Sequence, residues 1–262
     1  MTPKAIDIEY SGPVARIWMN RPSVHNACDE VLIEKLTEAF LNLEQPHIRV
    51  IVLAGRGSSF SAGADIDWMK RQGMASVESN LTDARSLANL FATISRSSKT
   101  TIACVHGKAL GAGVGLIAAC DIAIGAGDTV LGMPEVRIGL IPATIAPYVL
   151  RAIGERHARR LFQTGERIDA ATAEKIGLLH RIVEPDQLDV QLERIVSDIL
   201  KGSPQAQLAA KELIAAVANQ VISPALIEET AQLIASRRAE PDAKEGLSAF
   251  LEKRPAAWVP RP

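Results

Sequence analysis

The sequence predicts an α/β protein made of repeated strand, loop and helix units, followed by a helical C-terminal region. Short apolar runs that end near glycine alternate with longer segments whose apolar residues recur at the helical period. After Pro142 the pattern becomes mostly helical. We therefore expect an α/β core over residues 1–202 and a helical region over residues 203–262.

The first elements are a hairpin and a helix. Residues 5–10 and 14–19 flank Gly12-Pro13, which is typical of a β-hairpin. Asp29 is placed to cap a helix. Apolar residues at helical spacing follow it, namely Leu32, Ile33, Leu36, Ala39, Phe40 and Leu43.

The middle of the chain repeats a buried strand followed by glycine. Residues 50–53, 101–105 and 122–124 are short apolar runs of this kind. A helix is expected over residues 77–94, with one apolar face formed by Leu81, Ala84, Leu87, Ala88 and Phe91. The repeat is irregular, yet it favours stacked βα-type units over a plain sandwich.

Three helices are expected to begin in the C-terminal region, each with proline at or near its first position. Their start points are Ser203-Pro204, Ser223-Pro224 and Pro241-Asp242. A run of helices after an α/β core often wraps a neighbouring chain, so we expect an oligomer.

Composition and charge argue against several classes of protein. The 262 residues include 29 basic and 30 acidic side chains, a balance that argues against a nucleic-acid-binding surface. No apolar run approaches the ~20 residues of a membrane helix, and no signal segment opens the chain, so we expect a cytoplasmic protein. Cys28, Cys104 and Cys120 lack metal-ligand spacing, so we expect free thiols and no metal site.

Two loops of small residues are the most informative feature. Residues 55–66 and 109–115 each follow a strand end and are rich in glycine and alanine. Such loops can direct backbone N–H groups outward, and two of them together can polarise one carbonyl oxygen. The alternative is that their glycines serve only tight turns, which positive φ angles permit.

Glu135 is the main candidate for proton transfer. It lies in the apolar stretch Met133-Pro134-Glu135-Val136, which should desolvate the carboxyl and raise its pKa. A glutamate after proline is otherwise typical of the first turn of a helix. The sequence does not assign Asp121 or Glu155 the role of a second catalytic acid, and Asp121 is expected to cap or anchor a strand end.

Several motifs follow one another in a recognisable order: Asn20-Arg21-Pro22, Asn26-Ala27, residues 60–66, residues 107–111, residues 120–122, Pro134-Glu135 and residues 250–254. Together they resemble the enoyl-CoA hydratase/isomerase (crotonase) family over nearly the whole chain. The resemblance implies an α/β crotonase-like spiral of ββα units, with a helical C-terminal oligomerisation region and a homotrimer or hexamer. It implies an acyl-CoA substrate and no separate cofactor, since coenzyme A is part of the substrate.

The resemblance also implies site residues. The backbone N–H groups of Ala64 and Ala112 would stabilise an enolate-like thioester oxyanion, with Glu135 as the catalytic carboxyl. Ala112 stands where relatives carry glycine, and it retains the N–H. The implied substrate-binding residues are Ala62, Asp65, Ile66, Trp68, Gly111, Gly115, Pro142, Phe250 and Lys253, the last two acting from a neighbouring subunit.

Gly115 stands where two-glutamate hydratases of this family carry their other glutamate. The segments that begin at Ala64, Gly111 and Gly139 resemble the methylglutaconyl-CoA and isohexenylglutaconyl-CoA hydratase branch, whose members can also lack it. The implied activity is a hydro-lyase for a glutaconyl-type CoA thioester. Arg137 and Arg151 are candidate partners for its second carboxylate, and the alternative is that they are surface arginines on a strand end and a helix.

Two other functions stay open. A Δ3–Δ2 enoyl-CoA isomerase needs only one carboxyl, Glu135, to remove a proton and return it two carbons along. The other alternative is a non-catalytic member of the family that binds acyl-CoA or RNA. The near-neutral charge and the intact Glu135 argue against it.

Overall fold

The computed structural model describes residues 4–260 and divides into two compact units, Met1–Glu193 and Arg194–Pro262. The division falls within helix α7 (Leu188–Lys201). It lies slightly before residue 202, the end of the α/β core predicted from the sequence. Among the described residues, no helix is long and apolar enough to cross a membrane.

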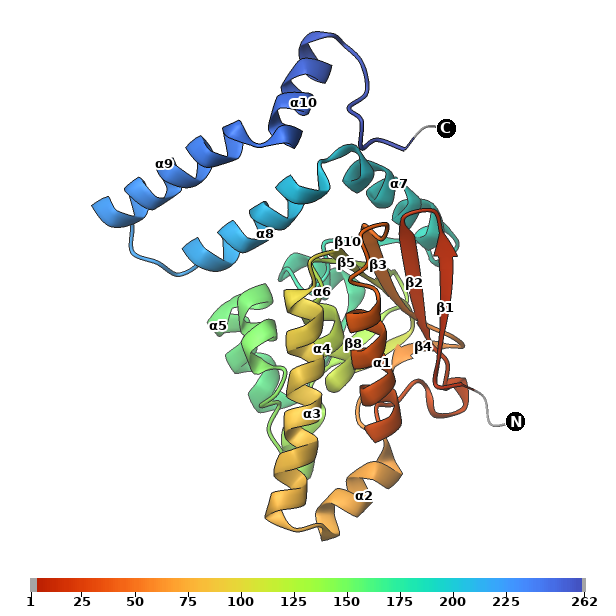
Figure 1. The fold of residues 1–262 in the computed structure, drawn as a ribbon. Helices are drawn as coiled ribbons and strands as arrows, with labels where there is room; N and C mark the ends of the chain where they lie inside the picture. Colours follow the sequence, from red (N-terminus) through yellow and green to blue (C-terminus); the bar gives the residue numbers. More distant parts are fainter. Residues whose placement is uncertain (1–3, 261–262) are drawn as a thin grey trace. The chain divides into compact units, whose positions relative to one another are not determined.

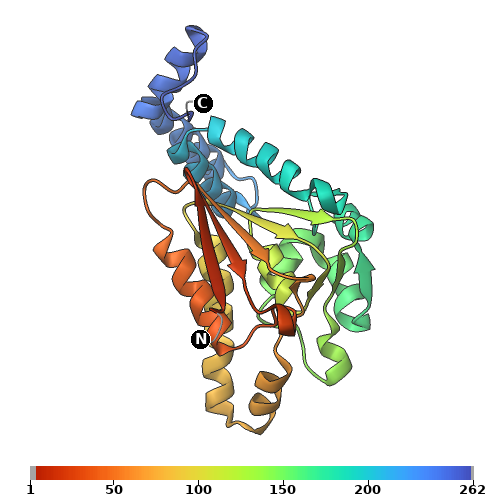
Figure 2. The same ribbon diagram turned by 90° about the vertical axis from the view of Figure 1, so that its right-hand side faces the viewer.

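A six-stranded sheet forms the larger layer of the first unit, in the order β1-β2-β3-β5-β7-β10. Its strands twist into the fan seen in Figure 2. The expected hairpin is present, because β1 (Ile6–Ser11) and β2 (Val14–Met19) pair antiparallel, and the other neighbouring strands pair in parallel. The remaining strands are β3 (Val50–Gly55), β5 (Thr100–Val105), β7 (Ile122–Ala126) and β10 (Arg181–Val183).

A second sheet has four short strands in the order β4-β6-β8-β9. They are β4 (Ser59–Ser61), β6 (Lys108–Leu110), β8 (Val130–Gly132) and β9 (Arg167–Asp169). Each repeat contributes its first strand to the large sheet and its second strand to the small one, as in β3 then β4, β5 then β6, and β7 then β8. The predicted spiral of ββα units is therefore confirmed.

Helices α1 (Glu30–Asn42) and α3 (Val77–Arg96) pack side by side against the large sheet (Figures 1 and 2). The predicted cap is confirmed, since the Asp29 carboxylate accepts a hydrogen bond of 2.8 Å from the Leu32 N–H. The other elements of this unit are α2 (Ile66–Met74), α4 (Ala112–Ala119), α5 (Ala146–Thr164), α6 (Ala170–Lys175) and the 3-10 turns η1 (Pro22–Val24), η2 (Pro134–Ile138) and η3 (Pro185–Gln187).

Helix α4 lies in the centre of the first unit and is buried almost all round. Its small residues allow close packing against the small sheet, because a Cβ added at Gly113 would lie 2.6 Å from the Ser61 carbonyl oxygen. The start of α4 is thereby held next to the end of β4, and this places the two small-residue loops side by side.

The second unit is helical, as predicted. Helices α8 (Pro204–Val217), α9 (Pro224–Ala239) and α10 (Pro241–Leu251) each begin at a predicted proline. Ser203 and Ser223 cap the first two by accepting hydrogen bonds of 3.0 and 3.2 Å. These helices expose large apolar side chains, among them Ile214, Ile227, Ile234, Leu247, Phe250 and Leu251.

Candidate active site

A cavity of about 850 Å³ lies within the first unit. Its walls come from the loop after β4, helices α2 and α3, the junction of β6 with α4, and the segment from η2 to Ile145. Seven of the predicted site residues line it: Ala62, Ala64, Trp68, Gly111, Ala112, Glu135 and Pro142.

The backbone N–H of Ala64 faces away from its neighbouring strand. Cys28 forms a short parallel bridge here, donating to the Gly63 carbonyl at 2.7 Å and accepting from the Asp65 N–H at 2.9 Å. The Gly63 carbonyl and the Ala64 N–H belong to one trans peptide group, so they point in opposite directions. Gly63 has a φ of +95°, which favours glycine. The bridge therefore turns the Ala64 N–H away from Cys28, on the side of the loop that lines the cavity.

The N–H of Ala112 has no hydrogen-bond partner within its helix, because Ala112 is the first residue of α4. Gly111 precedes α4, and its carbonyl accepts from Val114 and Gly115 at 2.9 and 3.2 Å. The Ala112 N–H belongs to the same peptide group, points out of the helix start and has no intrahelical partner. Gly111 carries the positive φ of +48°, whereas Ala112 is helical, so alanine at 112 retains the donor without strain.

The two donors lie on adjoining loops. A Cβ added at Gly63 would lie 2.9 Å from the Leu110 carbonyl oxygen, and one added at Gly111 would lie 3.9 Å from the Gly63 Cα. Within residues 4–260, no acceptor engages the N–H of Ala64 or Ala112. The positive end of α4 adds its field at the same place. This arrangement suits a carbonyl oxygen that gains negative charge.

Glu135 lies beside these donors, in the first turn of η2. A Cβ added at Gly111 would be 3.0 Å from Glu135 Oε1. The other carboxyl oxygen, Oε2, is buried and has no hydrogen-bond partner among the described residues. Burial raises the pKa of Glu135, which confirms the direction predicted from its apolar setting. A carboxyl of this kind can both accept a proton and return it.

Gly115 does not line the cavity. It is buried in α4, where an added Cβ would lie 2.3 Å from Ile145 Cγ2 and 2.9 Å from the Phe91 ring. Hydrocarbon therefore fills the position of a second glutamate side chain, and the cavity has Glu135 as the acid beside the two donors.

Two further predicted residues lie outside the cavity wall. The Asp65 carboxylate caps α2 by accepting from the Asp67 and Trp68 N–H groups at 2.9 and 3.2 Å. Ile66 projects from the first turn of α2 and is 66% exposed. Their substrate-binding roles stay predictions, and so do those of Phe250 and Lys253, which belong to the second unit.

The two candidate arginines differ in their position relative to the cavity, and Asp121 and Glu155 lie in structural roles. Arg137 lines the cavity and donates from Nε to the Thr164 carbonyl at 3.3 Å, whereas Arg151 is exposed outside it. Asp121 anchors a strand end as predicted, accepting from the Thr101 N–H and hydroxyl at 2.8 and 2.9 Å. Glu155 is paired with Arg159 on the surface of α5.

In the part of the chain that the structure describes, no disulfide joins Cys28, Cys104 or Cys120. Burial raises the pKa of the Cys28 thiol to about 12, so it is not a nucleophile at neutral pH. Among the residues that the structure describes, no group of three His, Cys, Asp or Glu side chains is placed to hold a metal ion.

Part of the cavity wall was not assigned from the sequence. Gln72 and Asp83 line it and are hydrogen bonded to each other, which ties α2 to α3. Gln72 lies four residues after Trp68, so the helical period could have placed it on the same face. Ile145 and Thr144 also line the wall, and local sequence gives no indication of this.

Comparison with known proteins agrees with this geometry. The model of the family described as "Enoyl-CoA hydratase/isomerase" matches residues 9–261. An enoyl-CoA hydratase structure from Shewanella pealeana is 37% identical with a TM-score of 0.94, covering 97% of this chain and 96% of the other. A crotonyl-CoA hydratase from Syntrophomonas wolfei is 32% identical and covers 97% of both chains.

A 2,3-dehydroadipyl-CoA hydratase from Escherichia coli is 31% identical, over 92% of this chain and 93% of that protein. The matches span the ββα core with its two small-residue loops and Glu135 as well as the C-terminal helices. The chain is thus an enzyme that belongs to the enoyl-CoA hydratase/isomerase family.

Proposed function

We propose that this enzyme is a hydro-lyase that adds water to the double bond of a glutaconyl-type CoA thioester, such as 3-methylglutaconyl-CoA or isohexenylglutaconyl-CoA. One observation carries the chemistry: a buried, unpartnered carboxyl oxygen of Glu135 lies beside two unpartnered N–H groups. The hydratases that share about a third of its sequence support the reaction class.

The proposed reaction uses one carboxyl twice. The Glu135 carboxylate accepts a proton from water while the water oxygen bonds to Cβ of the enoyl thioester. The π electrons of the double bond move toward the thioester oxygen, where the Ala64 and Ala112 N–H groups stabilise the negative charge. The Glu135 carboxyl then returns the proton to Cα, so that the elements of one water molecule are added.

Arg137 supports a substrate with a second carboxylate. Arg137 is one of the residues that line the cavity; its Nε donates to the Thr164 carbonyl at 3.3 Å, and its charge helps to lower the pKa of Glu166. A guanidinium can hold a carboxylate by two parallel hydrogen bonds. The Escherichia coli relative is named for a thioester of a dicarboxylic acid, which supports this class of substrate.

A second candidate is a Δ3–Δ2 enoyl-CoA isomerase. The hydrocarbon around Gly115 favours it, since isomerisation needs only one carboxyl. Glu135 would remove a proton from C2 of a 3-enoyl thioester and return it to C4, with the same oxyanion between the two steps.

The deciding assay follows the absorbance of the conjugated enoyl thioester on 3-methylglutaconyl-CoA, crotonyl-CoA and a 3-enoyl-CoA in parallel. Selective loss of absorbance with the glutaconyl ester supports the proposal. A gain of absorbance with the 3-enoyl ester alone would establish the isomerase instead.

The assembly is proposed to be a homotrimer or hexamer. The exposed apolar side chains of the C-terminal helices, including Phe250 at 79% exposure, support association through this region.

Replacing Glu135 by Gln should lower kcat for hydration about 10²- to 10⁴-fold, because the proton acceptor is lost.

In the parent enzyme, kcat/KM should fall on the acidic side at a pH above the pKa of an ordinary glutamate. Burial raises the pKa of Glu135, and the carboxylate is the active form. Steady-state rates from pH 4 to 9 test both points. Glu155→Gln, on the surface of α5, is the control and should keep full activity. An unchanged rate in Glu135→Gln contradicts the mechanism.

Replacing Gly115 by Ala should lower the free energy of unfolding by about 1–3 kcal/mol, because the new methyl group meets Ile145 and Phe91 in a packed core. Gly73→Ala is the matched control. Gly73 is also helical, but a Cβ there meets nothing within 4 Å, so the change should be neutral or stabilising. Urea unfolding of both variants measures the difference, and equal midpoints would disprove the packing argument.

Replacing Arg137 by Gln should raise KM for 3-methylglutaconyl-CoA about fivefold. This increase corresponds to the roughly 1 kcal/mol that a solvent-accessible ion pair contributes to binding. KM for crotonyl-CoA, which has no second carboxylate, should not change. Arg151→Gln serves as the control because that arginine lies outside the cavity wall. A parallel rise for both substrates would refute carboxylate recognition by Arg137.

A further inference from the structure

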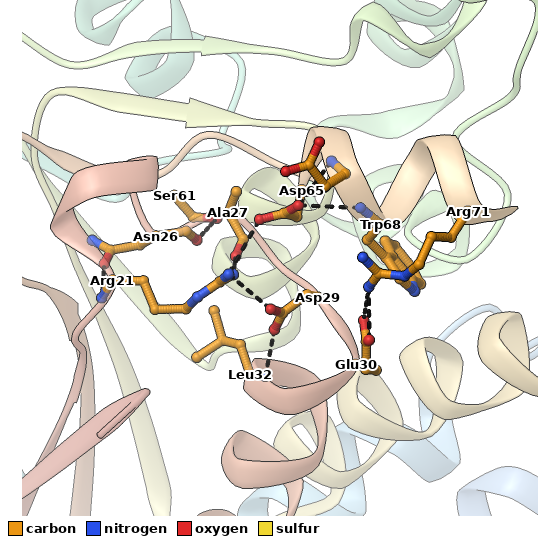
Figure 3. A network of polar contacts seen from close by, with 11 residues as sticks. Arg21, Asn26, Ala27, Asp29, Glu30, Leu32, Ser61, Asp65, Trp68 and Arg71 are labelled. Atoms are coloured by element: carbon orange, nitrogen blue, oxygen red, sulfur yellow. Dashed lines mark hydrogen bonds and ion pairs between the residues drawn. The ribbon is translucent and has the colours of Figure 1, made fainter. Parts of the chain in front are cut away.

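Arg21 begins a chain of hydrogen bonds that leads to the peptide group of Ala64, and Figure 3 shows its first contact, between Arg21 and Ala27. Its Nη1 donates to the Ala27 carbonyl at 2.5 Å. The peptide group that contains this carbonyl also contains the Cys28 N–H, which donates to the Gly63 carbonyl at 2.7 Å. That second peptide group contains the Ala64 N–H. Two peptide groups in series therefore connect a guanidinium to the first of the two donors.

We infer that Arg21 is a positioning residue that polarises this chain and strengthens the Ala64 N–H as a donor to the thioester oxyanion. A cation at one carbonyl withdraws electron density from its peptide group, which makes the attached N–H a better donor to the next carbonyl. The same step repeats at Gly63. The inference rests on the proposed thioester chemistry, and Arg21 itself touches no reacting atom.

The guanidinium is held in a fixed place. Its Nη2 lies 2.7 Å from Asp29 Oδ2 and 3.2 Å from Asp65 Oδ2, and the three side chains are only 22%, 15% and 12% exposed. Burial raises the pKa of Asp65, but the Trp68 and Asp67 N–H groups and the Arg21 charge outweigh it and lower this pKa. Asp65 thus stays ionised. Because Nη2 serves both carboxylates, Nη1 is left for Ala27.

Arg21 also has a structural role that must be separated from this one. By pairing with Asp29 and Asp65 it joins the caps of α1 and α2. The chain offers a matched control, since Arg71 of α2 pairs with Glu30 of α1 at 2.7 Å. That pair joins the same two helices (Figure 3) without touching Ala27, Cys28 or Gly63. A purely structural contribution should appear in both arginines.

The experiment compares Arg21→Gln, Arg21→Lys and Arg71→Gln with the parent enzyme. The probe is the CoA thioester of 4-dimethylaminocinnamic acid, a conjugated enoyl thioester whose absorption moves to longer wavelength when its carbonyl oxygen is polarised. Three quantities are measured: the shift of absorption at saturation, kcat and KM for the substrate that is turned over, and the unfolding midpoint.

Arg21→Gln should lower kcat about three- to tenfold, which is a fraction of the ~10²- to 10³-fold effect of removing a whole oxyanion donor. KM should stay within about twofold, and the absorption shift should shrink. Arg21→Lys keeps the charge and should keep most of the shift. Arg71→Gln should leave both kcat and the shift unchanged, whatever it does to the unfolding midpoint.

A folded Arg21→Gln variant that binds the probe with the full shift would overturn the inference, as would an equal loss of shift in Arg71→Gln. If Arg21→Gln does not fold, the lysine variant decides: a shift smaller than that of the parent supports the inference, because one ammonium cannot bond Asp29, Asp65 and Ala27 as the guanidinium does, and a shift equal to that of the parent contradicts it. A parent enzyme that binds the probe without any shift would contradict the proposed function itself.

Discussion

The short bridge between Cys28 and the Gly63–Asp65 segment is the interaction on which the rest of the site depends. It fixes the peptide group between Gly63 and Ala64. The Gly63 carbonyl accepts a hydrogen bond from Cys28, and the Ala64 N–H therefore faces the cavity. Both ends of the bridge belong to loops whose positions follow from the spiral of strands. The large sheet carries β2 and β3, and the chain segments that follow them meet where the bridge forms. A catalytic donor is thus held by backbone pairing and needs no flexible side chain.

The cavity combines groups that each cost stability when they have no partner. Unpaired N–H groups and a buried carboxyl oxygen cost about 1–3 kcal/mol apiece in a protein interior. Here they adjoin one another, so one bound thioester can satisfy them together. The side chains of Ile145 and Phe91 fill the space beside Gly115, so no acidic side chain extends from that position toward Glu135. Burial raises the pKa of Glu135 above that of an ordinary glutamate, as is common for a carboxyl that exchanges protons.

Much of this arrangement was predictable from the sequence, for identifiable reasons. The helix after Asp29 carries a long apolar pattern, the strands near residues 50 and 122 are uninterrupted apolar runs followed by glycine, and these predictions are confirmed. The three-residue strands β4, β6 and β8 were not separated from their loops, since three residues carry no periodicity. The neighbours of Gly115 come from α3 and from the segment before α5, so only the tertiary fold shows why glycine is needed. The link from Arg21 to Ala64 runs through backbone groups, which leave no pattern of residue types.

The most direct test of the central claim is a crystal structure of the enzyme with a non-reactive acyl-CoA thioester bound in the cavity. We expect the thioester oxygen to lie within hydrogen-bond distance, ~2.7–3.1 Å, of the backbone nitrogens of both Ala64 and Ala112. We also expect the Glu135 carboxyl to lie beside Cα and Cβ of the acyl group. An oxygen that binds away from these two nitrogens, or an Ala64 peptide group turned by about 180° relative to the bridge with Cys28, would contradict that claim.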